Sequence, residues 1–97
     1  MSTKWLSCSI SPGQFPTEYA VAGTQHNGEG FSLFAPREFI VPPKEQEGLG
    51  LVRVDVIDQK GDLVLIRLPA QTFENGQYVT VKVSDLHDPL AVQRIGA

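Results

Sequence analysis

The sequence has little cysteine, since Cys8 is the single one among its 97 residues. One thiol cannot form an internal disulfide, which favours a reducing, cytoplasmic location. A reactive thiol would need a base or a cation beside it. Cys8 instead alternates with Leu6 and Ile10, in the manner of strand residues that face a core. We therefore predict that Cys8 is buried and takes no part in chemistry.

Long apolar stretches are missing as well. Crossing a bilayer takes roughly 20 consecutive apolar residues, and no run in the chain approaches that length. A secretory leader needs an apolar stretch of roughly 7 to 15 residues. Near the N-terminus only Trp5 and Leu6 could contribute to one. We expect neither a membrane segment nor a leader.

Positive charge is scarce and scattered. The net charge is -3, and the eight Lys and Arg residues form no block. Binding along a phosphate backbone requires clustered positive charge. Nucleic acid is therefore a poor default partner for this chain.

Helical periodicity is the last feature that the sequence lacks. No window long enough for a helix carries an apolar stripe of period 3.6. Period-2 alternation and β-branched residues recur instead, and Gly, Pro and Asn lie between the alternating segments. These patterns predict strands at 4–10, 18–22, 30–34, 38–41, 51–57, 63–68, 78–83 and 91–95.

The predicted strands form one domain over 1–97. We expect N-terminal strands in 1–41, an exposed loop rich in Pro, Gly and charge at 42–50, and barrel hairpins in 51–97. About seven short strands with tight turns indicate a small barrel or a two-sheet sandwich. We predict an all-β, SH3-like barrel of about five to seven antiparallel strands with an added N-terminal hairpin. A small two-sheet sandwich is the alternative.

The segment V-R-V-D-V-I-D-Q-K-G-D-L-V-L-I-R-L-P, residues 52–69, reads as a hairpin. Asp58 and Gly61 suit the first and fourth positions of a type I turn. A three-residue loop between Asp58 and Asp62 would give one wholly aliphatic face, which must point to the core. Its predicted cross-strand pairs are Val56–Val64, Val54–Ile66 and Val52–Leu68.

The opposite face of this hairpin is the candidate functional surface. In the predicted register Arg53 opposes Arg67, and Asp55 lies diagonally between them as a counter-charge. The remaining residues of the face are too apolar to be left in water. Either the N-terminal segment, with Trp5 and Phe15, or a partner protein should cover them. The predicted interaction face comprises Leu51, Arg53, Asp55, Ile57, Leu63, Leu65 and Arg67.

Other residues that could carry chemistry have simpler roles. Asp85, His87 and Asp88 lack the spacing of a strong metal motif, and a capped turn explains them. His26 suits a hairpin tip. No nucleophile with a positioned base and no phosphate-binding loop is recognisable. We expect no catalytic residue, no metal and no cofactor.

The sequence favours a non-catalytic protein-interaction module or small subunit, not an enzyme, which acts through self-association or by binding a protein partner. The alternative is a small-molecule binder or minimal enzyme whose site forms between subunits, because one barrel of this size has little room for a pocket. Nucleic-acid binding through Trp5, Phe31 and Tyr78 is a third hypothesis, which the acidic composition disfavours.

Overall fold

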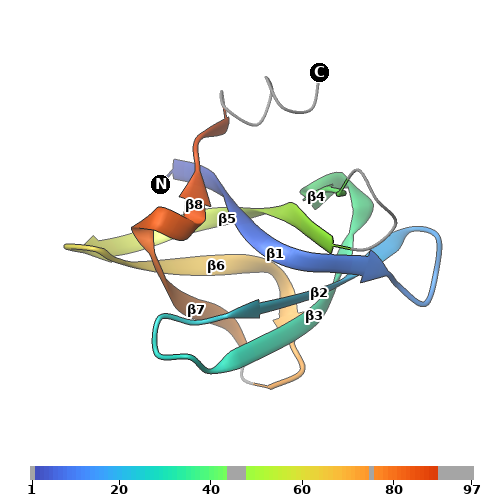
Figure 1. Cartoon of the computed structure of the whole chain (residues 1–97), viewed down its shortest axis with the longest axis horizontal. Helices are drawn as coiled ribbons and strands as arrows, with labels where there is room; N and C mark the ends of the chain where they lie inside the picture. The colour runs from blue at the N-terminus through green and yellow to red at the C-terminus, as the bar shows by residue number, and fades with distance from the viewer. Residues whose placement is uncertain (1, 44–47, 75, 90–97) are drawn as a thin grey trace.

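The computed structural model describes residues 2–43, 48–74 and 76–89. Within them the chain is all-β, as predicted, apart from two three-residue 3-10 helices (Figure 1). No helix of the described residues has the length and apolarity that a bilayer crossing requires. The elements in chain order are β1 (Ser2–Pro12), β2 (Glu18–Thr24), β3 (Gly30–Pro36), η1 (Arg37–Phe39), β4 (Ile40–Val41), β5 (Gly48–Lys60), β6 (Leu63–Thr72), β7 (Gly76–Lys82), η2 (Val83–Asp85) and β8 (Leu86–His87).

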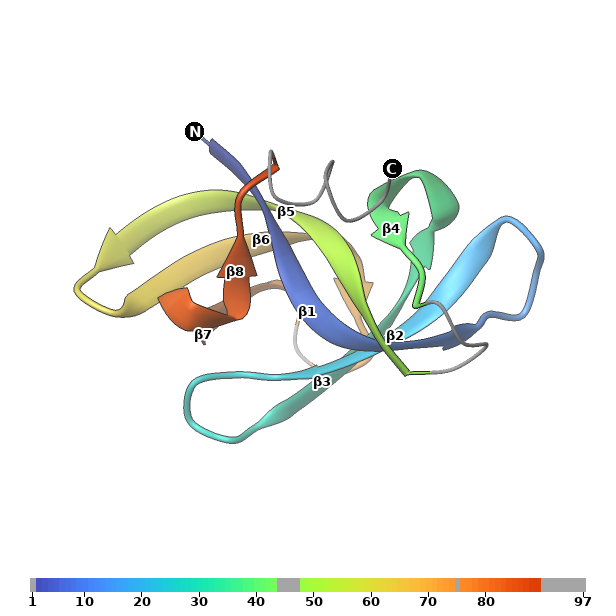
Figure 2. The same cartoon turned by 45° about the horizontal axis from the view of Figure 1, so that its top comes forward.

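The strands form one antiparallel sheet that curls into a half-barrel, with the order β3-β2-β1-β5-β6-β7. β1 crosses the middle of the molecule (Figure 2). It pairs with β5 along one edge and with β2 and β8 along the other. The two-residue strand β4 pairs with β5. The curl follows from the right-handed twist of long strands, which accumulates across the sheet.

Hydrogen bonds from two turns connect the ends of the curled sheet. In the turn between β2 and β3, the His26 N–H donates to the Thr80 carbonyl of β7 at 3.0 Å, and the Gln25 side-chain oxygen accepts from the Thr80 N–H at 3.3 Å. In the turn between β6 and β7, the Phe73 N–H donates to the Ser32 carbonyl of β3 at 2.8 Å. The outer strands are thus held together without a continuous ladder.

The core lies inside the curl and consists of alternate residues from each long strand, as period-2 burial requires. The aliphatic face predicted for the hairpin is confirmed as core, although Val56 at its end is only partly buried. The buried residues are Leu6, Cys8, Ile10, Val21, Phe31, Leu33, Ala35, Ile40, Val52, Val54, Val64, Ile66, Leu68, Val79 and Val81.

Some predicted elements differ from the structure. The segment at 38–41 is not one strand, because η1 occupies its first half and leaves only β4 for pairing. The capped turn predicted around His87 is a 3-10 turn followed by β8, which pairs with β1. Two residues are too few to show alternation, so this strand leaves no periodic signal. The strand predicted at 91–95 lies outside the described residues.

The turn and register predicted for the β5–β6 hairpin are wrong. Lys60 pairs with Leu63, so the loop has two residues, and Gly61 occupies its first position with a φ of 58°. Glycine at that position is typical of a type II′ turn, whose twist matches the flanking strands. Asp58 lies in β5 and accepts the Gln59 N–H at 2.8 Å.

The burial of Cys8 is confirmed, since its side chain is 2% exposed. Burial, and secondarily the negative charge of Asp85, raise the pKa of the Cys8 thiol to about 12. The thiol therefore stays protonated at neutral pH, and a protonated thiol is a poor nucleophile.

Cys8 should resist alkylation as long as the protein is folded. We expect that iodoacetamide at about pH 8 leaves the native protein unmodified and alkylates the same thiol fully in guanidinium chloride, with mass spectrometry as the readout. Rapid alkylation of the native state would contradict the buried position.

A hydrogen-bonded carboxylate should make the closure of the sheet dependent on pH. Glu74 accepts the Ser32 hydroxyl at 2.6 Å and the Ser32 N–H at 2.7 Å. These two bonds, the hydroxyl first, lower the pKa of Glu74 in the folded protein. Their stabilising effect is present above the ordinary glutamate pKa of about 4.3 and is lost as the pH falls further.

Urea unfolding at about pH 5 and about pH 3 tests this dependence. The wild type should lose more stability on acidification than the Glu74→Gln variant, which cannot titrate at that position. The Ser32→Ala variant should also show a weaker pH dependence, because the hydroxyl that lowers the pKa is gone. Identical acid sensitivity of all three proteins would contradict the assignment.

Candidate functional site

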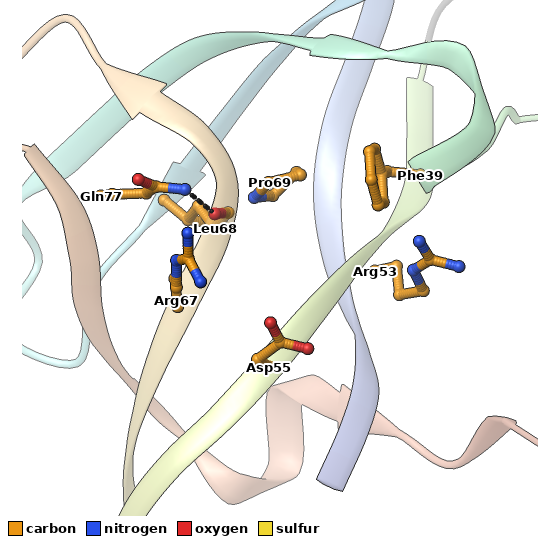
Figure 3. A pocket seen from close by; sticks show the side chains of 7 residues that line it. All are labelled: Phe39, Arg53, Asp55, Arg67, Leu68, Pro69 and Gln77. Atoms are coloured by element: carbon orange, nitrogen blue, oxygen red, sulfur yellow. Dashed lines mark hydrogen bonds between the residues drawn. The ribbon is translucent and has the colours of Figure 1, made fainter. Parts of the chain in front are cut away.

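The candidate site is a hollow of about 240 Å³ on the outer face of the sheet, at the point where β6 separates from β5 (Figure 3). Side chains from β5, β6, β7 and η1 surround it. Its lining consists of Phe39, Arg53, Asp55, Arg67, Leu68, Pro69 and Gln77.

The hollow exists because β6 leaves both of its neighbours near Pro69. Its pairing with β5 ends at Arg67, and Pro69 has no N–H with which to extend a ladder. On the other side, the register between β6 and β7 shifts between Arg67 and Thr72. Within this bulge the Gln77 side chain donates to the Leu68 carbonyl at 2.7 Å, as the dashed line in Figure 3 marks. Gln77 thus satisfies a carbonyl that the interrupted ladder leaves unpaired.

Two arginines carry the positive charge of the hollow. The guanidinium carbon of Arg53 lies 4.4 Å from the centroid of the Phe39 ring, which is a cation–π contact. Arg67 lies directly opposite Asp55 in the ladder between β5 and β6, whereas the predicted register placed the two residues diagonally across from each other. Even so, no ion pair joins either guanidinium to a carboxylate within residues 2–43, 48–74 and 76–89. Both groups keep their N–H donors available.

The outer face continues from the hollow across three strands in regular rows. Beside the hollow, one row runs Asp55, Arg67, Tyr78, and the next two run Asp58, Leu65, Thr80 and Lys60, Leu63, Lys82. Between the first two rows β5 carries a bulge at Ile57. A bulge places two residues opposite one, so Ile57 and Asp58 share Leu65 as their cross-strand neighbour. A second hollow of about 220 Å³ lies over Leu63 and Leu65.

The apolar residues of this face are covered to different degrees. Tyr78 is 54% exposed, Leu63 38% and Ile57 37%, whereas Leu65 is half-buried. The N-terminal segment does not lie over them, because β1 pairs edge to edge with β5 and extends the same sheet. Among the described residues, these side chains therefore have no covering layer.

Leu51, the remaining residue of the predicted face, lies apart from the others. It is half-buried between Ser7 of β1 and Val41 of β4. Together with Pro42 and Pro43 it lines a separate hollow of about 270 Å³. Phe15, which one of the two alternatives placed over the face, is 63% exposed in the loop between β1 and β2.

The histidine and acids near the end of the described chain make local contacts. The ring Nε2 of His87 lies 2.9 Å from the Ser7 hydroxyl oxygen. Asp88 forms an ion pair with Lys4. No three His, Cys, Asp or Glu side chains of the described chain are placed so that they could share a metal ion.

Sequence reasoning missed Phe39, Leu68, Pro69 and Gln77, which complete the hollow. A proline after an alternating run could have indicated the point where β6 leaves the sheet. The hypothesis that Trp5, Phe31 and Tyr78 form an exposed surface for nucleic acid is wrong for Phe31, which is only 4% exposed. Its ring lies across Gly23, where an added Cβ would come within 2.4 Å of the Phe31 Cζ.

Comparison with protein families, curated proteins and solved structures gives no significant match for this chain. The site must therefore be interpreted from its own chemistry. Guanidinium groups, an amide and an exposed apolar surface can bind and orient a ligand.

The Gln77 side chain should stabilise the bulge that forms the hollow. The Gln77→Ala variant removes the donor to a partly buried carbonyl, and we expect a loss of about 1 kcal/mol in the free energy of unfolding in urea. Gln59→Ala is the matched control, because Gln59 donates to the Gly61 carbonyl at an exposed position. Equal losses in the two variants would contradict the structural role of Gln77.

Proposed function

We propose that the curled sheet is an SH3-like barrel to which the hairpin of β2 and β3 is added. The order of the elements supports this interpretation. β5, β6 and β7 follow one another as a meander, then η2 comes, and β8 returns to pair with β1 at Trp5 and Leu6. A last strand that pairs with the first gives a small sheet the closure that removes exposed edges.

We propose that the protein acts as a non-catalytic binding module or small subunit, through the outer face of β5, β6 and β7. The observation that carries this proposal is the uncovered apolar surface around Ile57, Leu63 and Tyr78, with Arg53 and Arg67 beside it. Exposed aromatic and aliphatic side chains next to arginine are typical of protein interfaces. Exposed apolar side chains that share one face of the sheet support a partner surface there.

The hollow by itself supports small-molecule binding less well. Its volume of about 240 Å³ lies below the roughly 300 to 1,000 Å³ of most ligand pockets. A partner surface could cover it, whereas a free ligand would remain largely in water. We therefore place the protein-binding function first, without a cofactor. We keep a cytoplasmic location as part of the proposal because of the single cysteine.

Matched charge substitutions on and off the outer face test the proposed interface. Leu63→Glu alters the face, and Phe15→Glu places the same charge on an exposed side chain in another part of the molecule. Each tagged variant is purified from the native host, and its co-purifying proteins are quantified by mass spectrometry. We expect a partner that Phe15→Glu retains and Leu63→Glu loses roughly tenfold or more.

Two controls make this result decisive. Thermal unfolding must show that both variants are folded, and light scattering of the wild type reports self-association. If the wild type is a strict monomer and every co-purifying protein responds equally to the two substitutions, the proposed interface is wrong.

A further inference from the structure

We infer that the hollow between Arg53 and Arg67 binds a carboxylate, and that the partner presents it on an acidic peptide segment which also carries an apolar side chain. This inference rests on the proposed function and adds the chemical class of the partner. Three observations carry it: the charge of the outer face, the available guanidinium groups, and the position of the second hollow.

The outer face has a charge opposite to that of the whole chain. Its rows together with Arg53 carry four basic and two acidic side chains, while the chain has a net charge of -3. All of these side chains are exposed. Such a face attracts a negatively charged partner and repels a second copy of itself. The basic residues are Arg53, Lys60, Arg67 and Lys82, and the acidic ones are Asp55 and Asp58.

The two guanidinium groups reach the hollow from opposite sides, with that of Arg53 on the side of Phe39 (Figure 3). The ring of Phe39 supports Arg53 from one side at 4.4 Å and takes none of its N–H donors. Arg67 comes from the neighbouring strand, and both arginines line the same hollow. Guanidinium groups bind carboxylates through paired, charge-assisted hydrogen bonds.

Asp55 determines how strongly the hollow favours an anion. Its side chain lies between the two arginines, on the rim of the hollow (Figure 3). A carboxylate entering the hollow would meet this like charge, so Asp55 weakens anion binding. A cationic ligand would show the opposite dependence. The effect of neutralising Asp55 therefore reports whether the bound ligand is anionic or cationic.

The second hollow suggests where the apolar part of the partner lies. Leu65 precedes Arg67 by two residues on β6 and lines the second hollow of about 220 Å³. Residues at this interval are about 7 Å apart along a strand and share a face. An extended peptide that carries Glu and Leu two residues apart would reach both hollows at once.

Fluorescence anisotropy with a labelled peptide, Ser-Glu-Ser-Leu-Ser-Glu-Ser-Leu, tests the inference on the intact protein. The competitors are the same peptide with Gln for Glu, the same peptide with Lys for Glu, and oligothymidine. We expect the Glu peptide to bind most tightly. Its affinity should fall with added salt, because exposed charges are screened.

Substitutions in the hollow give the sharper result. Arg67→Gln and Arg53→Gln should each weaken binding of the Glu peptide by roughly tenfold. Asp55→Asn should strengthen it by about two- to fivefold. Arg37→Gln is the control, since Arg37 lies outside the hollow and donates to the Pro16 carbonyl at 3.2 Å. It should leave the affinity unchanged.

The failure of this inference can be told apart from the failure of the proposed function. Equal binding of the Glu and Gln peptides, both lost in Leu63→Glu, would overturn the carboxylate site and leave the protein-binding face intact. Weaker binding in Asp55→Asn, no binding of the Glu peptide, or tighter binding of oligothymidine would also overturn it. The proposed function is decided separately, by the co-purification of host proteins with Leu63→Glu and Phe15→Glu.

Discussion

The backbone pairing of β5 is the interaction on which the rest of the structure depends. This 13-residue strand pairs with β1 along one edge, and with β4 and then β6 along the other. Because β5 pairs with other strands along both of its edges, it connects the two halves of the sheet, and its bending makes the sheet curl. The bulge at Ile57 adds to the bend, since an extra residue increases the local twist. On the edge that faces β4 and β6, Arg53 lies between the two partner strands, and the hollow forms beside it.

The curled sheet divides the chain into surfaces with different chemistry. The curl buries one alternating set of aliphatic side chains from each long strand and leaves a chemically inert interior, which includes the Cys8 thiol. The side chains of the outer face do not pack into the core, so this face can carry charged residues. Because β6 must leave β5 at Pro69, Arg67 stands at the edge of a hollow, next to the stacked pair of Arg53 and Phe39. The same irregularity that ends the ladder thus creates the candidate site.

Much of the fold could be predicted from alternation, and the predicted faces of the β5–β6 hairpin are correct although its register is wrong. The predicted partner of Val56 was Val64, and the actual partner is Ile66. An error of two residues preserves the face to which each side chain points, because the strand period is two. The local turn preference of Asp58 and Gly61 was therefore a weaker constraint than the pairing of the whole strand. The candidate site was predictable only in part, since Phe39 and Gln77 come from segments distant from the hairpin.

The sequence by itself determined that the protein is all-β, which face of the β5–β6 hairpin points to the core, and that Cys8 is buried, because these properties depend on the alternation of neighbouring residues. Only the tertiary structure decided the strand register, the pairing of β8 with β1, and the grouping of Arg53, Arg67 and Phe39 around one hollow. These features arise from contacts between segments that are far apart in the chain, and they depend on where a bulge or a proline interrupts a ladder. Local patterns carry no information about such distances, so alternation could place Arg53 and Arg67 on one face of the hairpin but could not bring Phe39 and Gln77 beside them.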